Sequence, residues 1–250
     1  MKNVSLHLKQ VPAWRWIIAA VFLFGFSLEG NTFLSYTGGQ PSYQEMSVNS
    51  FNRVVVFSQY MILLLIIADF GFKEAKGTKL FTRGLAYLAL LSLLYIVIIM
   101  AFHLLVMLIK HGAIDTRDSW STMQIRGIEW ITPLLAMGLS VLLFWLRFVF
   151  ISAVVYAVNR RCAKTPYGFA AGIALCLFDI IVYYNFGPYE PMCIFPFEHA
   201  NLEFTLRMTP YPALNIAISA AYWGVLIAAV SILDHIMNRP KQLKDNGVKP

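Results

Sequence analysis

Two charged residues stand inside long apolar runs of this sequence and are its clearest sign of chemistry. Arg147 interrupts the run FWLRF, and Asp179 interrupts the run CLFDII. Charged side chains inside a bilayer are costly and usually face the bundle interior or an oppositely charged partner. Arg147 lies ten residues before position 157, about 15 Å along a helix, and Asp179 lies 12 residues after position 167, about 18 Å. Measured from one membrane face these depths match, so the sequence predicts an ion pair between adjacent helices.

Three roles are open for these two residues. The pair could be structural and fix the packing of two helices. It could instead be a polar element along a substrate path or gate. In a third interpretation the two side chains do not meet, and the long Arg147 side chain extends towards water.

The segment 72–84, with the sequence FKEAKGTKLFTRG, is the second feature that could act. It is basic and amphipathic, which suits a short helix on the inner membrane surface. It equally suits docking into a groove of a soluble partner, or it serves only as a positively charged anchor. The candidate contact residues are Lys73, Glu74, Lys76, Lys79 and Arg83.

Motifs for catalysis, cofactors and metals are missing from the sequence. There is no P-loop, dinucleotide fingerprint, HExxH or G-x-S-x-G. The five histidines are scattered over different segments, and the three cysteines, Cys162, Cys176 and Cys193, have no metal-site spacing. We therefore expect unpaired cysteines, no catalytic residues, no cofactor and no metal in this chain.

Composition identifies the environment in which these residues work. The 250 residues are 58% hydrophobic and only 13% charged, whereas soluble domains carry about 25% charged residues. The apolar residues form long continuous blocks, which predict an all-α membrane bundle because about 20 apolar residues cross the hydrocarbon core. Six spans are expected within a single transmembrane domain, 1–250: 14–34, 54–71, 85–109, 131–157, 167–184 and 211–237.

Basic residues orient these spans. With the N-terminus inside, the cytoplasmic segments hold 14 of the 20 Lys and Arg residues and the outer segments hold five. This asymmetry predicts that both termini are cytoplasmic. The net charge of +7 is then explained by topology and anionic lipid headgroups, and not by nucleic acid.

The last outer segment, 188–202, is too apolar for an ordinary loop and too broken for a full span. Prolines at 188, 191 and 196 prevent a continuous helix. The segment predicts half-inserted helices or a tight lid on the outer end of the bundle.

Together these features resemble the permease subunit of ABC-2 type ABC transporters, especially small bacterial permeases of peptide export and immunity systems. The resemblance covers the layout of almost the whole chain. An approach segment precedes the first span, and a charged loop with Glu74, Gly77 and Arg83 follows the second. The apolar outer segment IFPFEH, 194–199, follows the fifth span, a last span contains SAAY at 219–222, and a basic tail ends the chain.

The resemblance implies a multi-pass protein of a bacterial cell membrane. Two permease subunits, identical or homologous, would bind soluble ATP-binding-cassette ATPase subunits, and the segment 72–84 would couple ATP hydrolysis to the spans. The substrate would be a peptide, an antibiotic or a lipid-like molecule. A membrane scaffold or immunity protein that acts by binding, without an ATPase, is the alternative. A third is an ion-coupled carrier or an intramembrane enzyme. The carrier is disfavoured because no internal repeat is visible, and the enzyme because Arg147 and Asp179 alone are too few converging polar groups.

Overall fold

The computed structural model describes residues 11–35, 40–52, 56–68, 70, 78–121, 130–162, 165–186 and 196–237. These residues contain nine α-helices and no strand. The helices are α2 (Ala13–Ser35), α3 (Tyr43–Asn52), α4 (Val56–Ile67), α5 (Thr78–His111), α6 (Pro133–Cys162), α7 (Thr165–Phe186), α8 (Pro196–Ala200), α9 (Leu202–Arg207) and α10 (Pro212–Met237). The predicted all-α fold class is therefore confirmed at this level.

Proline marks the start of several helices. Pro133, Pro196 and Pro212 are the first residues of α6, α8 and α10, and Pro166 is the second residue of α7. Proline suits this position because its fixed φ is helical and the missing N–H would have no intrahelical partner there.

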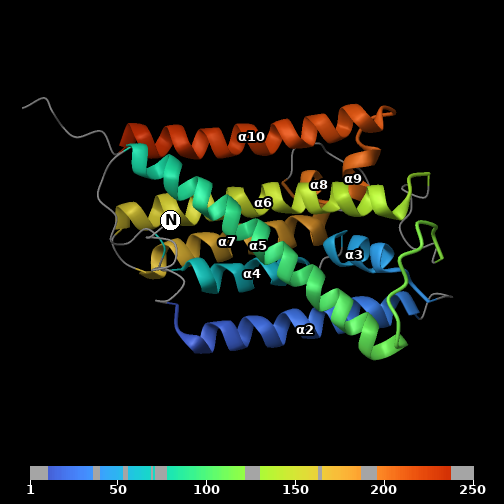
Figure 1. The fold of residues 1–250 in the computed structure, drawn as a ribbon. Coiled ribbons are helices and arrows are strands. Elements are labelled where there is room, and N and C mark those ends of the chain that lie inside the picture. Colours follow the sequence, from blue (N-terminus) through green and yellow to red (C-terminus); the bar gives the residue numbers. More distant parts are fainter. Residues whose placement is uncertain are drawn as a thin grey trace, which may run out of the picture.

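Helix α6 is the centre of the bundle. It packs against α5, α7, α10 and α3, and Figure 1 shows it running between α10 and α7. Of the residues in its apolar part, 56% are buried, against 11% in α10. Polar side chains on α6 thus lie inside the protein, whereas most of α10 faces outward.

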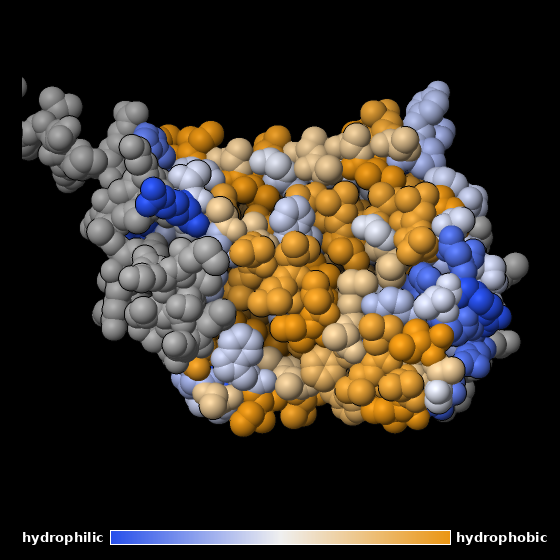
Figure 2. All heavy atoms as spheres, viewed as in Figure 1, coloured by the Kyte–Doolittle hydropathy of each residue, from blue (hydrophilic) through white to orange (hydrophobic). Residues whose placement is uncertain are grey.

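Three described helices are long and apolar enough to cross a membrane, namely those at 81–111, 133–162 and 212–237. The stretches Ala13–Gly25 and Tyr167–Val182 are shorter apolar helices. Figure 2 shows a broad apolar surface along the middle of the bundle, with hydrophilic residues at both ends, and the largest visible group of them lies at the end that carries the loop 112–121. We name this the outer end, following the predicted orientation, and the opposite end the inner end.

Helix α5 begins at Thr78, seven residues before the start of the predicted span 85–109, so the segment 78–84 forms its first turns. In the structure Gly84 lies against the ring of Tyr156, and a Cβ at Gly84 would come within 2.4 Å of that ring. The glycine therefore permits close packing of α5 on α6 and does not end a helix.

Helix α3 was not predicted, because the sequence after the first span suggested an outer loop. Its residues from Gln44 to Phe51 are buried although the helix is polar. Helix α3 packs into the outer end of the bundle, between α2, α5 and α6. Met46, Val48 and Phe51 pack into the core of the protein, and the Glu45 side chain accepts hydrogen bonds from Ser121.

Candidate functional site

An ion pair between Arg147 and Asp179 lies at the centre of the candidate site. Arg147 Nη2 donates to Asp179 Oδ2, and the two side chains are 3% and 6% exposed. The ring of Tyr60, on α4, lies 4.2 Å from the guanidinium carbon of Arg147. This cation–π contact and the carboxylate together stabilise the buried positive charge.

Close packing of α7 on its neighbours brings Asp179 to Arg147. Gly168 and Gly172 are spaced as a GxxxG pair, which lets helix backbones approach closely in membranes. A Cβ at Gly168 would lie 1.9 Å from Asn159 Oδ1, and one at Gly172 would lie 2.5 Å from a methyl of Leu64. Helices α6 and α4 therefore both lie against the glycine face of α7.

A cavity of about 140 Å³ adjoins the ion pair. Its walls come from α6, α7 and α10, and Pro196 of α8 contributes to its lining. Apart from the ion pair and Tyr222, the lining side chains are apolar: Phe150, Ile151, Leu175, Phe178, Trp223 and Leu226.

The short helices α8 and α9 are fastened to α10 beside this cavity. His199 Nδ1 lies 2.9 Å from Ser219 Oγ, and the imidazole stacks on Tyr222 with ring centroids 3.9 Å apart. Trp223 Nε1 donates to the carbonyl of His199 at 3.0 Å. These contacts position the Tyr222 and Trp223 side chains that line the cavity.

A second buried ion pair lies near the inner end of the bundle. Arg160 Nη1 donates to Asp234 Oδ2, and the side chains are 2% and 1% exposed. This pair joins α6 to α10, as the first pair joins α6 to α7. Buried pairs fix helix positions because breaking one leaves an uncompensated charge.

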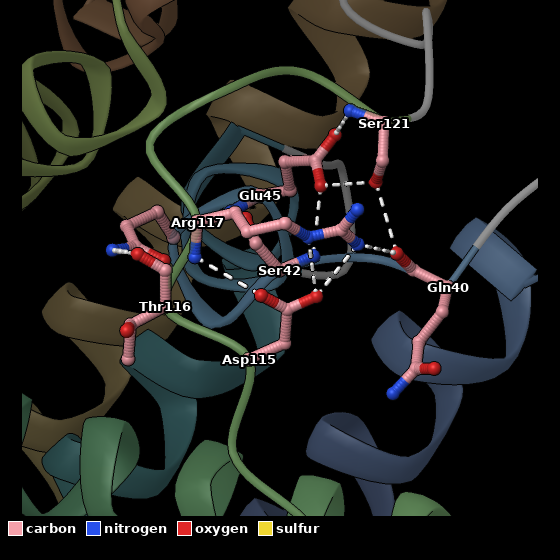
Figure 3. A network of polar contacts seen from close by, with 8 residues as sticks. Gln40, Ser42, Glu45, Asp115, Thr116, Arg117 and Ser121 are labelled. Carbon is pink, nitrogen blue, oxygen red and sulfur yellow. Dashed lines mark hydrogen bonds and ion pairs between the residues drawn. The ribbon is translucent and has the colours of Figure 1, made fainter.

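At the outer end a network that we name the outer clasp joins α3 to the loop 112–121 (Figure 3). It consists of Ser42, Glu45, Asp115, Arg117 and Ser121. Ser42 N donates to Glu45 Oε2 at 2.7 Å, and Glu45 N donates to Ser42 Oγ at 3.2 Å, which is the reciprocal capping box of a helix start. Ser121 donates to both Glu45 oxygens, from N at 2.7 Å and from Oγ at 2.6 Å.

Arg117 and Asp115 form the exposed side of the outer clasp. Arg117 Nε donates to Asp115 Oδ2 at 2.7 Å, and Arg117 Nη2 donates to the carbonyl of Gln40 at 3.2 Å. The hydrogen bonds from Arg117 hold the pKa of the Asp115 carboxyl below its usual range. The same partnership raises the pKa of Arg117.

The predicted coupling residues are only partly described. Arg83 is exposed on α5, and Lys79 belongs to the first turn of the same helix. Lys73, Glu74 and Lys76 lie outside the described residues. Of the predicted site residues, Arg147 and Asp179 are thus in contact with each other. Arg83, on α5, belongs neither to this ion pair nor to the lining of the cavity beside it.

Tyr60, Tyr222 and Glu45 were missed by sequence reasoning. Tyrosines in apolar runs carry no signal of a cation–π partner, so only the structure identifies the first two. Glu45 was identifiable, because Ser42 and Glu45 have the S-x-x-E spacing of a capping box. Among the described residues no group of three or more His, Cys, Asp and Glu side chains could hold a metal ion.

Comparison with protein-family models, with curated proteins and with solved structures finds no match to this chain.

Proposed function

We propose that this chain is the permease subunit of an ATP-driven membrane transporter, related in layout to the ABC-2 type and exporting a peptide, antibiotic or lipid-like substrate. Six spans with both termini in the cytoplasm belong to this proposal. A soluble ATPase would bind at the inner end near Arg83, and a second permease subunit would complete the transporter.

The segment between α7 and α10 is the observation that carries the proposal. The resemblance to ABC-2 permeases singles out an apolar outer segment at this place in the chain. Here that segment folds back on the bundle as α8 and α9, fastened to α10 through His199, Ser219 and Trp223. A scaffold needs no such insertion, whereas a transporter needs an outer closure close to its substrate site.

The position of the buried ion pair is a second support. Arg147 and Asp179 meet next to a cavity between three helices, and intramembrane ionisable residues often mark substrate pathways. The pair also fixes helix packing, so its location supports transport only together with the cavity.

The test is a pull-down of the tagged full chain from its native cells in mild detergent. We expect a soluble P-loop ATPase at near-equal stoichiometry. Reversing both charges of the proposed coupling contact, Glu74→Lys with Arg83→Glu, should abolish its capture. Lys110→Glu, an exposed charge reversal on the other end of α5, is the matched control and should leave capture unchanged.

Recovery of the chain without any ATPase, even after chemical cross-linking, would refute the permease proposal and favour a scaffold or immunity protein. Equal loss of the ATPase in the control would show that the loss is not specific to Glu74 and Arg83, and would refute their role as the coupling contact.

A further inference from the structure

The groove between α7 and α10 offers a binding site that the ion pair alone does not explain. Both helices pack along α6 but have almost no contact with one another. The cavity of about 140 Å³ lies between them, with Arg147 and Asp179 among its lining side chains. The charged pair thus borders a cavity that is large enough for a small ligand. Larger apolar side chains at the lining positions would fill this cavity, but the sequence does not have them there.

The groove borders the apolar outer surface of the bundle. Phe178, which lines it, is 48% exposed, and on either side Ile181 of α7 and Val225 of α10 are 58% and 67% exposed. In a bilayer such side chains face acyl chains. A ligand would therefore reach the groove sideways from the membrane, and its exposed part would stay in hydrocarbon.

The charges of the site select the kind of ligand. The charges of Arg147 and Asp179 cancel, so a ligand with a net charge would bring an uncompensated charge into hydrocarbon, which is unfavourable. A hydroxyl or amide avoids this cost. It can donate a hydrogen bond to the carboxylate and accept one from the guanidinium.

The volume limits the apolar part of the ligand. A dry apolar cavity of about 150 Å³ holds one benzene molecule. The groove thus takes a group of roughly that size, such as an aromatic side chain or a short stretch of an alkyl chain.

We propose that the groove between α7 and α10 binds a neutral amphipathic molecule from the bilayer, with its apolar part in the cavity and its hydroxyl or amide group on the Arg147–Asp179 pair. This inference deepens the proposed function and rests on it for one point, that the ligand is the transported substrate. Binding itself requires no ATPase.

The test uses the purified full chain in bicelles with a photoreactive, diazirine-bearing octanol, and maps the adducts by peptide mass spectrometry. We expect adducts on the parts of α7 and α10 that flank the groove, and displacement by excess octanol. Octanoate, which has the same chain length but a negative charge, should compete at least about tenfold more weakly, equivalent to about 1.4 kcal/mol.

Two tryptophan substitutions on neighbouring residues of α10 separate the groove from the general lipid surface. Leu226→Trp fills the groove and should reduce labelling about tenfold, again about 1.4 kcal/mol. Val225→Trp adds the same bulk to a residue that is 67% exposed and should leave labelling unchanged. If Leu226→Trp does not fold, Leu175→Trp fills the same groove from α7.

Labelling spread evenly over the exposed face of α10, or reduced equally by both α10 variants, would overturn the groove site. Competition by octanoate as strong as that by octanol would overturn the neutral head group. Because no ATPase is present, failure of the pull-down leaves these results intact. Conversely, capture of the ATPase together with even labelling of α10 would refute only the binding site in the groove and not the proposed function.

Discussion

Replacing Gly168 by alanine should destabilise the bundle far more than one methyl group suggests. The new Cβ would lie 1.9 Å from Asn159 Oδ1 and 2.9 Å from the carbonyl oxygen of Val155. Such distances are too short, so either Asn159 must move or α7 must shift away from α6. Asn159 cannot move freely, because its Nδ2 donates to the carbonyls of Ala68 and Phe70 at 2.9 Å each.

The expected magnitude combines two effects. Overpacking of a tight interior costs about 1–3 kcal/mol. Losing two hydrogen bonds that hold the chain after α4 adds about 1 kcal/mol each when the carbonyls stay buried. We therefore expect Gly168→Ala to lower the free energy of unfolding by about 1–3 kcal/mol if α7 shifts and the two bonds survive, and by about 3–5 kcal/mol if both bonds are lost.

The assay is unfolding of the purified protein in mixed micelles with increasing sodium dodecyl sulfate, followed by circular dichroism. Gly224→Ala is the matched control, since a Cβ at Gly224 meets nothing within 4 Å. Alanine is a better helix former than glycine by up to about 1 kcal/mol, so this variant should be neutral or slightly more stable.

A double-mutant cycle then identifies the clashing partner. In an Asn159→Ala background the side-chain clash is gone, so Gly168→Ala should cost only about 1 kcal/mol, from its contact with Val155. An equal cost in both backgrounds would refute the clash with Asn159. A Gly168→Ala variant as stable as the control would refute the close packing of α7 on α6.

Three further outcomes are expected. Glu45→Gln should lower the free energy of unfolding by about 2 kcal/mol in the same micelle assay, because its amide nitrogen would face an N–H donor of the buried outer clasp. Because the pKa of Asp115 is lowered in the folded protein, its bond to Arg117 stabilises the fold fully above about pH 4, and this stabilisation is lost as the pH falls through the lowered pKa. In Arg117→Gln the titration midpoint of this carboxyl, followed by carbon-13 NMR, should rise. Asp179→Leu alone should cost about 3–5 kcal/mol in the micelle assay, and adding Arg147→Met should restore most of that loss, since only the single change leaves a buried charge without its partner.

For each of these three predictions, a specific result would contradict it. Glu203→Gln, in a partly exposed ion pair with Arg207, is the control for Glu45→Gln and should cost less than about 0.5 kcal/mol. Equal costs would refute the burial of Glu45 in the outer clasp. An unchanged midpoint in Arg117→Gln would show that another group lowers the pKa of Asp115. If Asp179→Leu with Arg147→Met is as unstable as Asp179→Leu alone, the ion pair stabilises the protein by more than the neutralisation of two buried charges.

Local physics explains which parts of the fold were predictable. The blocks that became α5, α6 and α10 were identified because only a helix satisfies the backbone of a long apolar run in hydrocarbon. Arg147 and Asp179 were singled out for the same reason, since charge in such a run demands a partner. Helix rise then related their depths, and the structure has them in contact.

Glycines show where local reasoning failed. Gly84 stands directly before the predicted span 85–109, and in the structure it lies within α5 against Tyr156. A glycine has the same local effect on the backbone in both cases. Only the neighbouring helix decides whether its missing side chain is a weakness or a contact surface.

The sequence by itself determined the helical class, the long apolar helices and the two charges inside apolar runs, because the hydropathy of a segment is a property of that segment alone. Tertiary structure decided the rest. It buried the polar helix α3, where Met46, Val48 and Phe51 pack in the core. Glu45 of this helix accepts a hydrogen bond from Ser121, 76 residues further along the chain. Tertiary structure likewise set the ring of Tyr60 over Arg147. It also left a cavity where α7 and α10 fail to meet. These features depend on which segments become neighbours, and that information lies in packing between helices and not in any one of them.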